Sequence, residues 1–247
     1  MIRRFLIILL GLFLGIAVSD ADAHHLDYEP KILLVTAHPD DDALFAATVF
    51  KTTHLLNGKV DLALMTNGEG GYKYSTLGNF IYDRELDKEE VGREYLPGIR
   101  KRELMAGGKI VGLRNYFFFD QVDNEYSEDI NNPMQAWDID WIKERFAKIL
   151  AKGNYDFVFT MMPSEDTHAH HKASAILALQ TIEQLPEDER PTVLATDIVS
   201  STEDSTNYSQ LQGYPISQRL MGTEPMLFDR RQTFGHDDRL NYKIIGN

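Results

Sequence analysis

Cysteine is absent from this sequence of 247 residues, and so are the signature motifs of several enzyme classes. Without cysteine the chain has no disulfides and no lipid anchor on a cysteine sulfur, so a hydrophobic core must hold the fold together. No G-x-S-x-G sequence is present, which argues against a serine hydrolase with a nucleophile elbow. The sequence also lacks G-x-G-x-x-G and P-loop motifs, so phosphate-binding loops of those types are not predicted.

Basic residues are scarce as well. The chain has 25 Lys and Arg against 38 Asp and Glu, which gives a formal net charge of −13. This charge argues against nucleic acid and anionic membrane surfaces as general partners. It places no restriction on a neutral small molecule or glycan, which we expect as the substrate. The sequence gives no indication of the oligomeric state.

The first 23 residues have the layout of a secretory signal peptide. Two arginines precede an apolar run over residues 5–18, and the small-residue pattern Ala-Asp-Ala follows at 21–23. The run is shorter than the roughly 20 residues that a membrane-spanning helix needs. We expect cleavage after Ala23 and a secreted or periplasmic chain without a stable membrane anchor; an uncleaved anchor is the alternative. Residues 24–247 would then form one catalytic domain, with a less patterned extension over 201–247.

Apolar runs alternate with helical patterns from residue 31 onward. Continuous apolar runs predict buried strands, and apolar residues at helical spacing predict helices. This alternation predicts an α/β fold: a Rossmann-like, mostly parallel sheet with helices on both faces. The expected strands cover 31–37, 59–66, 115–119, 156–162 and 192–200; the expected helices cover 42–58, 97–113, 138–153 and 171–185; long loops are expected at 67–85 and 120–133.

Two clusters of histidine and aspartate follow expected strands. The first is "AHPDDDALF", which contains His38 and three consecutive aspartates, and the second is "THAHHKASA", which contains three histidines. Ligands of open parallel sheets bind beyond the carboxyl ends of the strands, so both clusters are expected at the same sheet edge. Two imidazoles and one carboxylate with an open position are typical of catalytic zinc. A further carboxylate would remove a proton from the attacking water.

The two clusters resemble the motifs of the LmbE/PIG-L deacetylase superfamily, "HPDDE" and "HPDH". The likeness extends to "LMTNGEGG" and to "IRKRELMAGGKIVGL", over roughly residues 31–185. It implies a zinc-dependent hydrolase that removes the N-acetyl group from an N-acetylated amino sugar or glycoconjugate. The roles that it implies are zinc binding by His38, Asp41 and His171, general-base catalysis by Asp40, and stabilisation of the oxyanion by a protonated His168. It also suggests substrate contacts by Arg100, Asn67 and Glu69.

Three positions depart from the family motifs. Asp42 replaces a glutamate, and Ala169 and His170 replace a proline and an aspartate. Asp42 supports the site or is simply a carboxylate at a helix start, where the helix dipole favours it. The missing aspartate leaves the charge state of His168 open, and His170 either supports the site or ligates the metal itself.

The sequence is also consistent with other interpretations. An Asp-x-Asp site formed by Asp40 and Asp42 would suit Mn²⁺ or Mg²⁺ in a glycosyltransferase-like enzyme. A secreted zinc-binding or carbohydrate-binding relative without turnover is the second alternative. The acidic segment 120–133 is interpreted as a solvated loop. Aromatic residues of the C-terminal segment would stack on a sugar ring or pack as a lid: Tyr208, Tyr214, Phe228 and Phe234.

Overall fold

The computed structural model describes residues 28–199, 208–220 and 226–246. Its centre is a five-stranded sheet in the order β3-β2-β1-β4-β5, and every neighbouring pair is parallel. This confirms the predicted α/β class. The five strands are β1 (Lys31–Thr36), β2 (Lys59–Thr66), β3 (Leu113–Gln121), β4 (Phe157–Met161) and β5 (Thr192–Thr196).

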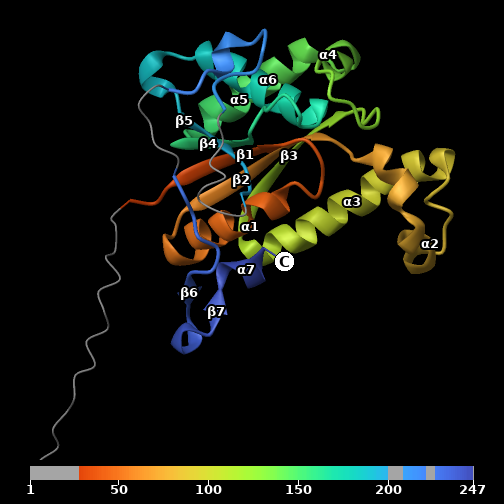
Figure 1. Cartoon of the computed structure of the whole chain (residues 1–247), viewed down its shortest axis with the longest axis horizontal. Helices are drawn as coiled ribbons and strands as arrows, with labels where there is room; N and C mark the ends of the chain where they lie inside the picture. Colours follow the sequence, from red (N-terminus) through yellow and green to blue (C-terminus); the bar gives the residue numbers. More distant parts are fainter. Residues whose placement is uncertain (1–27, 200–207, 221–225, 247) are drawn as a thin grey trace, which may run out of the picture.

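Helices cover both faces of the sheet (Figure 1). One face carries α1 (Asp42–Phe50) and α3 (Glu89–Val111), and the other carries α4 (Asn131–Ala136), α5 (Ile139–Gly153) and α6 (Ala169–Glu183). Each layer has its own apolar cluster against the sheet. Side chains alternate between the faces of a strand, so Leu33 and Val35 of β1 join one cluster and Ile32 and Leu34 join the other. All four are buried, which explains the uninterrupted apolar run.

The strand order places β1 between β2 and β4. The chain moves outward from β1 through β2 to β3, then returns to the other side of β1 to form β4 and β5. The crevice between the carboxyl ends of β1 and β4 is therefore the topological switch point, where open α/β sheets bind ligands. Thr66, at the end of β2, fixes this edge because its backbone N–H and its hydroxyl both donate to the carbonyl of Ala37.

The helix boundaries differ from the predicted ones around α3. This helix begins at Glu89 and contains Pro97, at which the sequence pattern had placed its start. The predicted loop over 67–85 contains a 3-10 segment, η2 (Glu69–Tyr74), and the helix α2 (Thr76–Tyr82). The helix predicted for 42–58 is α1 followed by a π-helical turn, η1 (Lys51–Leu55). The strand predicted for 192–200 ends at Thr196.

The described part of the C-terminal segment packs mostly away from the site. It contains the 3-10 turns η5 (Pro215–Ser217) and η6 (His236–Asp238), the hairpin β6 (Thr233–Phe234) and β7 (Leu240–Asn241), and α7 (Tyr242–Ile245). The ring of Phe234 lies against Phe50 at the end of α1 and against Tyr242. Phe228 also contacts Tyr242, so both phenylalanines pack in an aromatic group at the end of α1.

The predicted signal peptide lies outside the described residues. Among the residues that the structure describes, none of the helices has both the length and the apolar character needed to cross a bilayer.

Candidate active site

The segment after β1 folds back on itself through the side chain of Asp41. One carboxylate oxygen, Oδ2, accepts the backbone N–H of Ala37 at 3.0 Å and that of His38 at 2.7 Å. The backbone N–H of Asp41 donates in turn to the carbonyl of His38 at 3.2 Å. These contacts hold Asp41 and His38 side by side at the carboxyl end of β1. They also explain one of the three aspartates without reference to a ligand.

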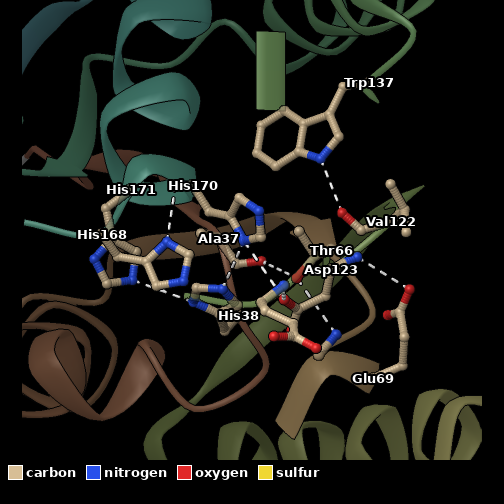
Figure 2. Close-up of polar contacts among 12 residues, drawn as sticks. Ala37, His38, Thr66, Glu69, Val122, Asp123, Trp137, His168, His170 and His171 are labelled. Carbon is tan, nitrogen blue, oxygen red and sulfur yellow. Dashed lines mark hydrogen bonds and ion pairs between the residues drawn. The ribbon is translucent and has the colours of Figure 1, made fainter. Parts of the chain in front are cut away.

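His171 reaches the same point from the first turn of α6. Its Nε2 lies 3.2 Å from Oδ1 of Asp41 and 3.2 Å from Nδ1 of His38. The Nδ1 of His38 lies 3.6 Å from the other carboxylate oxygen of Asp41, Oδ2, so the side chains of His38, Asp41 and His171 form a triangle of metal-ligand groups. The two clusters that are distant in the sequence therefore meet at the switch point of the sheet. Figure 2 shows His38 facing the histidines of α6.

This triangle has the donor set and the size of a zinc site. Four ligands at about 2.0–2.1 Å from a tetrahedral zinc lie about 3.3 Å from one another. The His38–His171 and His171–Asp41 separations of 3.2 Å are close to that spacing, and all three residues offer ligand atoms within 4.8 Å of one another. Two imidazole nitrogens with one carboxylate oxygen are the donors of many catalytic zinc sites. The Nδ1 of His171, on the other side of its ring, lies 3.3 Å from the hydroxyl of Thr167, which orients the ring.

Electrostatics at the triangle favours positive charge. Burial alone would raise the pKa of Asp41, but hydrogen bonds from His171 and His38 hold it well below its usual value. Burial lowers the pKa of His38, but the hydrogen bond and charge of Asp41 outweigh burial and raise it overall. Asp41 is therefore ionised, and its charge is directed to the space between the two imidazoles. A cation at that place would offset the charge of the buried carboxylate.

The other two histidines of the second cluster are neutral near pH 7. Burial, followed by the nearby His38 and His171, lowers the pKa of His168 to about 4. Burial also lowers the pKa of His170 to about 2, again with His38 as the next cause. The Nδ1 of His168 accepts the backbone N–H of His170 at 3.0 Å, which caps α6. The protonated His168 expected from the family motif is therefore not what the structure favours.

Asp40 points outward and is held by an arginine. Its side chain is 74% exposed, and its Oδ1 lies 3.0 Å from Nη2 of Arg100 on α3. Nη1 of the same arginine donates to the carbonyl of Gly68 at 2.7 Å. Gly68 has a left-handed backbone with φ of 71°, and a Cβ atom there would lie 2.2 Å from Arg100 Nη1. Glycine therefore allows the arginine to reach both the loop and Asp40.

The remaining predicted residues line the end of β2 and the start of α1. Asn67 Oδ1 and Glu69 Oε2 are buried acceptors without a hydrogen-bond partner among the residues that the structure describes. Burial raises the pKa of Glu69. Asp42 is the first residue of α1, and burial, with help from Asp41 and Asp40, raises its pKa to about 6. No group of ligand atoms at metal-binding spacing includes Asp40 or Asp42 among the described residues.

Asp123 is a site residue that the sequence interpretation missed. It lies just beyond β3, it is 5% exposed, and its Oδ1 is 3.7 Å from Nδ1 of His170. Its backbone N–H donates to Glu69 Oε1 at 3.0 Å, as Figure 2 shows. The interpretation of 120–133 as a solvated loop was wrong for this part of it. Its position in the sequence could have identified Asp123, because this residue follows a strand and therefore lies at the same sheet edge as the other two clusters.

The same loop supports the start of α6. The buried ammonium of Lys172 donates to the carbonyls of Glu128 and Glu165. The backbone N–H of Ala169 donates to the carbonyl of Ser127 at 2.6 Å. A hollow of about 370 Å³ lies beside this region, lined by Ser164, Glu165, Asp166, Asp197, Tyr208, Ser209 and Gln210. Tyr208 is thus one predicted aromatic residue that lies near the loop leading into the second cluster.

Comparison with known proteins identifies a family that this sequence matches. The family model described as PIG-L, GlcNAc-PI de-N-acetylase, matches residues 33–182, which is more than half of the chain. A Bacillus cereus protein named "Probable N-acetyl-alpha-D-glucosaminyl L-malate deacetylase 2" is 23% identical over 175 residues, which cover 71% of each chain.

Two solved structures are similar to parts of this chain at low sequence identity. N,N'-diacetylchitobiose deacetylase from Pyrococcus horikoshii has a TM-score of 0.47 and 22% identity, over 68% of this chain and 55% of that one. The 4-carboxy-2-hydroxymuconate hydratase from Pseudomonas putida has a TM-score of 0.49 and 20% identity, over 68% and 62%. This chain thus spans little more than half of the chitobiose deacetylase chain.

Proposed function

The chain belongs to the PIG-L family of GlcNAc-PI de-N-acetylases, and from this premise we propose that it is an exported zinc enzyme that hydrolyses the acetamide of an N-acetylated amino sugar or glycoconjugate. The observation that carries the proposal is the triangle formed by His38, Asp41 and His171. Its donor set and spacing suit zinc, and the exposed Asp40 lies beside it.

Zinc bound by His38, Asp41 and His171 would lower the pKa of a water molecule to about 7 and polarise the acetamide carbonyl. Asp40 is the general base in this proposal: its carboxylate takes the proton of the attacking water and then passes it to the leaving amine. Arg100 fixes the position of Asp40 by pairing with Oδ1, and the carbonyl of Gly68 holds the arginine. Arg100 is thus assigned a positioning role through Asp40 in addition to its predicted contact with the substrate.

His168 would stabilise the oxyanion as a neutral donor. Its Nδ1 accepts the backbone N–H of His170, so the proton of the neutral ring resides on Nε2. A hydrogen bond from Nε2–H supports developing negative charge without a protonated ring. The loss of the family's aspartate at position 170 therefore does not remove the donor from His168. This argument favours an active enzyme over the non-catalytic alternative.

The sugar would contact acceptors at the end of β2. Asn67 Oδ1 and Glu69 Oε2 are buried and unpaired in the described part of the chain, and an unpaired buried acceptor costs about 1–3 kcal/mol. A sugar hydroxyl would satisfy either acceptor only after side-chain movement exposes it, because neither atom is accessible in the structure. The glycosyltransferase-like alternative has less support, because Asp42 begins a helix and Asp40 is paired with Arg100.

Export is a separate part of the proposal, supported by the sequence of residues 1–23. Expression of the full chain in a bacterium, followed by mass measurement of the exported protein, tests it. Cleavage after Ala23 gives a chain that begins at His24. A full-length chain that stays with the cells would contradict export.

The proposed activity is tested by measuring acetate release by the purified chain that begins at His24. Suitable substrates are N-acetylglucosamine, N,N'-diacetylchitobiose and N-acetylglucosaminyl malate, with each amine product identified by mass. We expect acetate and amine in equal amounts, loss of activity with a chelator, and its return with zinc. Chelator-resistant acetate release would contradict the zinc mechanism.

A further inference from the structure

We propose that His170 is a positioning residue that accepts a hydrogen bond from Nε2–H of His38 and so directs Nδ1 of His38 to the metal. This inference rests on the proposed function. His170 occupies the position at which the sequence departs most from the family motif, because an imidazole replaces a carboxylate there.

The two ring nitrogens of His38 face different groups. Nδ1 lies in the triangle, 3.2 Å from His171 Nε2. Nε2 lies 3.0 Å from Nδ1 of His170, which is an ordinary hydrogen-bond length. Coordination through Nδ1 requires the proton of a neutral imidazole to be on Nε2. Nε2 then needs an acceptor, and His170 Nδ1 is the atom within reach.

The surroundings of His170 keep its Nδ1 available as that acceptor. Oδ1 of Asp123 is 3.7 Å from this nitrogen, which is too long for a hydrogen bond that would compete. His170 is 1% exposed, and Trp137 packs against its ring with the centroids 5.2 Å apart. Figure 2 shows His170 between His38 and Trp137.

The backbone of His170 is fixed from two sides. Its N–H is bound by the ring of His168, and its carbonyl accepts the hydroxyl of Ser174 at 2.7 Å. An acceptor that cannot turn away holds the tautomer of His38 that metal binding requires. Metal-ligating histidines in general depend on such a partner, and its loss typically weakens metal binding about 10–100-fold.

The same residues offer a competing arrangement, in which His38, His168 and His170 hold a second metal ion. Two observations disfavour it. The His168 Nδ1 is already used to cap α6, so a metal on that ring would compete with the cap. The 3.0 Å separation of His38 and His170 is a hydrogen-bond distance and is shorter than the about 3.3 Å edge of a tetrahedral zinc site.

Two substitutions at His170 distinguish the loss of the hydrogen-bond acceptor from a change in side-chain volume. In His170→Asn the amide oxygen lies near the place of Nδ1 and keeps the acceptor, whereas His170→Leu fills similar space without one. We expect zinc affinity, measured by chelator competition, to fall about 10–100-fold in His170→Leu and to stay within about threefold of wild type in His170→Asn. Leu177→Ala is the control for lost stability, because Leu177 is buried in α6 away from the triangle and its variant should keep wild-type zinc affinity.

Nitrogen-15 NMR spectra of the histidine rings in the zinc-loaded chains report the tautomer of His38, which a purely structural role of His170 would leave unchanged. Wild type and His170→Asn should show His38 metal-bound at Nδ1 and protonated at Nε2, and in His170→Leu the Nε2 proton should exchange faster with water. Two results would overturn this inference alone. One is a zinc affinity of His170→Leu equal to that of wild type. The other is two zinc ions per wild-type chain, of which one is lost in both His170 variants. A wild-type chain that binds no zinc would overturn the proposed function as well.

Discussion

Nδ1 of His38 lies 3.2 Å from Nε2 of His171, although 133 positions separate the two residues in the chain. His38 follows β1, and His171 belongs to the helix that comes after β4. β1 and β4 are parallel neighbours because the chain returns, after β3, to the other side of β1. The fold thus brings together two short histidine-containing segments that each lack a complete metal site. Asp41 completes the set through its hydrogen bonds to the backbone of the same loop.

The first prediction concerns the general base. Asp40→Asn should lower kcat by about 10²–10⁴-fold, because it removes the group that accepts the proton. Zinc content should not change, because Asp40 lies outside the triangle. Acetate release and elemental analysis of the same preparation measure both effects. Asp120→Asn is the control, since Asp120 is an exposed carboxylate paired with Lys101 and should be dispensable. Wild-type turnover in Asp40→Asn would disprove the assignment.

The second prediction concerns Gly68. A Cβ atom at this position would collide with Arg100, so Gly68→Ala should move the guanidinium away from Asp40 and reduce kcat with zinc retained. Gly107→Ala is the matched control, because a Cβ atom there meets no atom within 4 Å. In the interior of α3 that change should stabilise the protein by about 0.4–1 kcal/mol and leave kcat unchanged. Equal kcat in the two variants would contradict the role of Arg100.

The third prediction concerns His168. His168→Ala should lower kcat by about 10²–10³-fold, as expected for the loss of one oxyanion donor. His168→Gln should recover part of that loss, because its amide N–H donates from near the place of Nε2 without a charge. Kinetics over a set of substrate concentrations separate kcat from KM. Similar kcat values for the Ala and Gln variants would argue against a neutral donor.

The fourth prediction concerns stability away from the site. The buried Asp61 accepts hydrogen bonds from Arg114, Asn115 and the hydroxyl of Tyr155, the last at 2.8 Å. Tyr155→Phe should lower the free energy of unfolding by about 1.5–3 kcal/mol, the range for a bond to a charged group. Zinc affinity should not change. Tyr126→Phe is the control, because Tyr126 is exposed and its hydroxyl bonds Glu128 at the surface. Urea unfolding that does not distinguish the two variants would contradict this prediction.

The sheet was predictable because its strands are buried on both faces. Leu33, Leu34 and Val35 must all be apolar for that reason, so the continuous apolar run alone located β1. The start of α3 was missed because Pro97 is a typical first residue of a helix, whereas here it lies in the interior. The helix α2 was missed because the segment 67–85 is rich in Gly, Tyr and Asn, which favoured a loop. Its Leu77, Phe80 and Ile81 have helical spacing but are exposed in the structure.

The sequence predicted the candidate-site residues that lie within local motifs. His38, Asp41 and His171 were found because each lies in a dense run of metal-ligand side chains that follows a strand. Asp123 was missed because the acidic residues around it suggested a solvated loop, and its burial arises from contacts with Glu69 and α6. The direction of each ring nitrogen of His38 depends on packing between β1, α6 and Trp137, which no local pattern encodes.

The most direct test of the account is the zinc content of three purified chains, measured side by side by elemental analysis. We expect about one zinc per chain in wild type, the same in His54→Ala, and none in His171→Ala. His54 is the control because it lies at the surface, stacked on Phe50 and apart from the triangle. Zinc in His171→Ala equal to that in wild type, or no zinc in any chain, would contradict the central claim that the two clusters form one metal site.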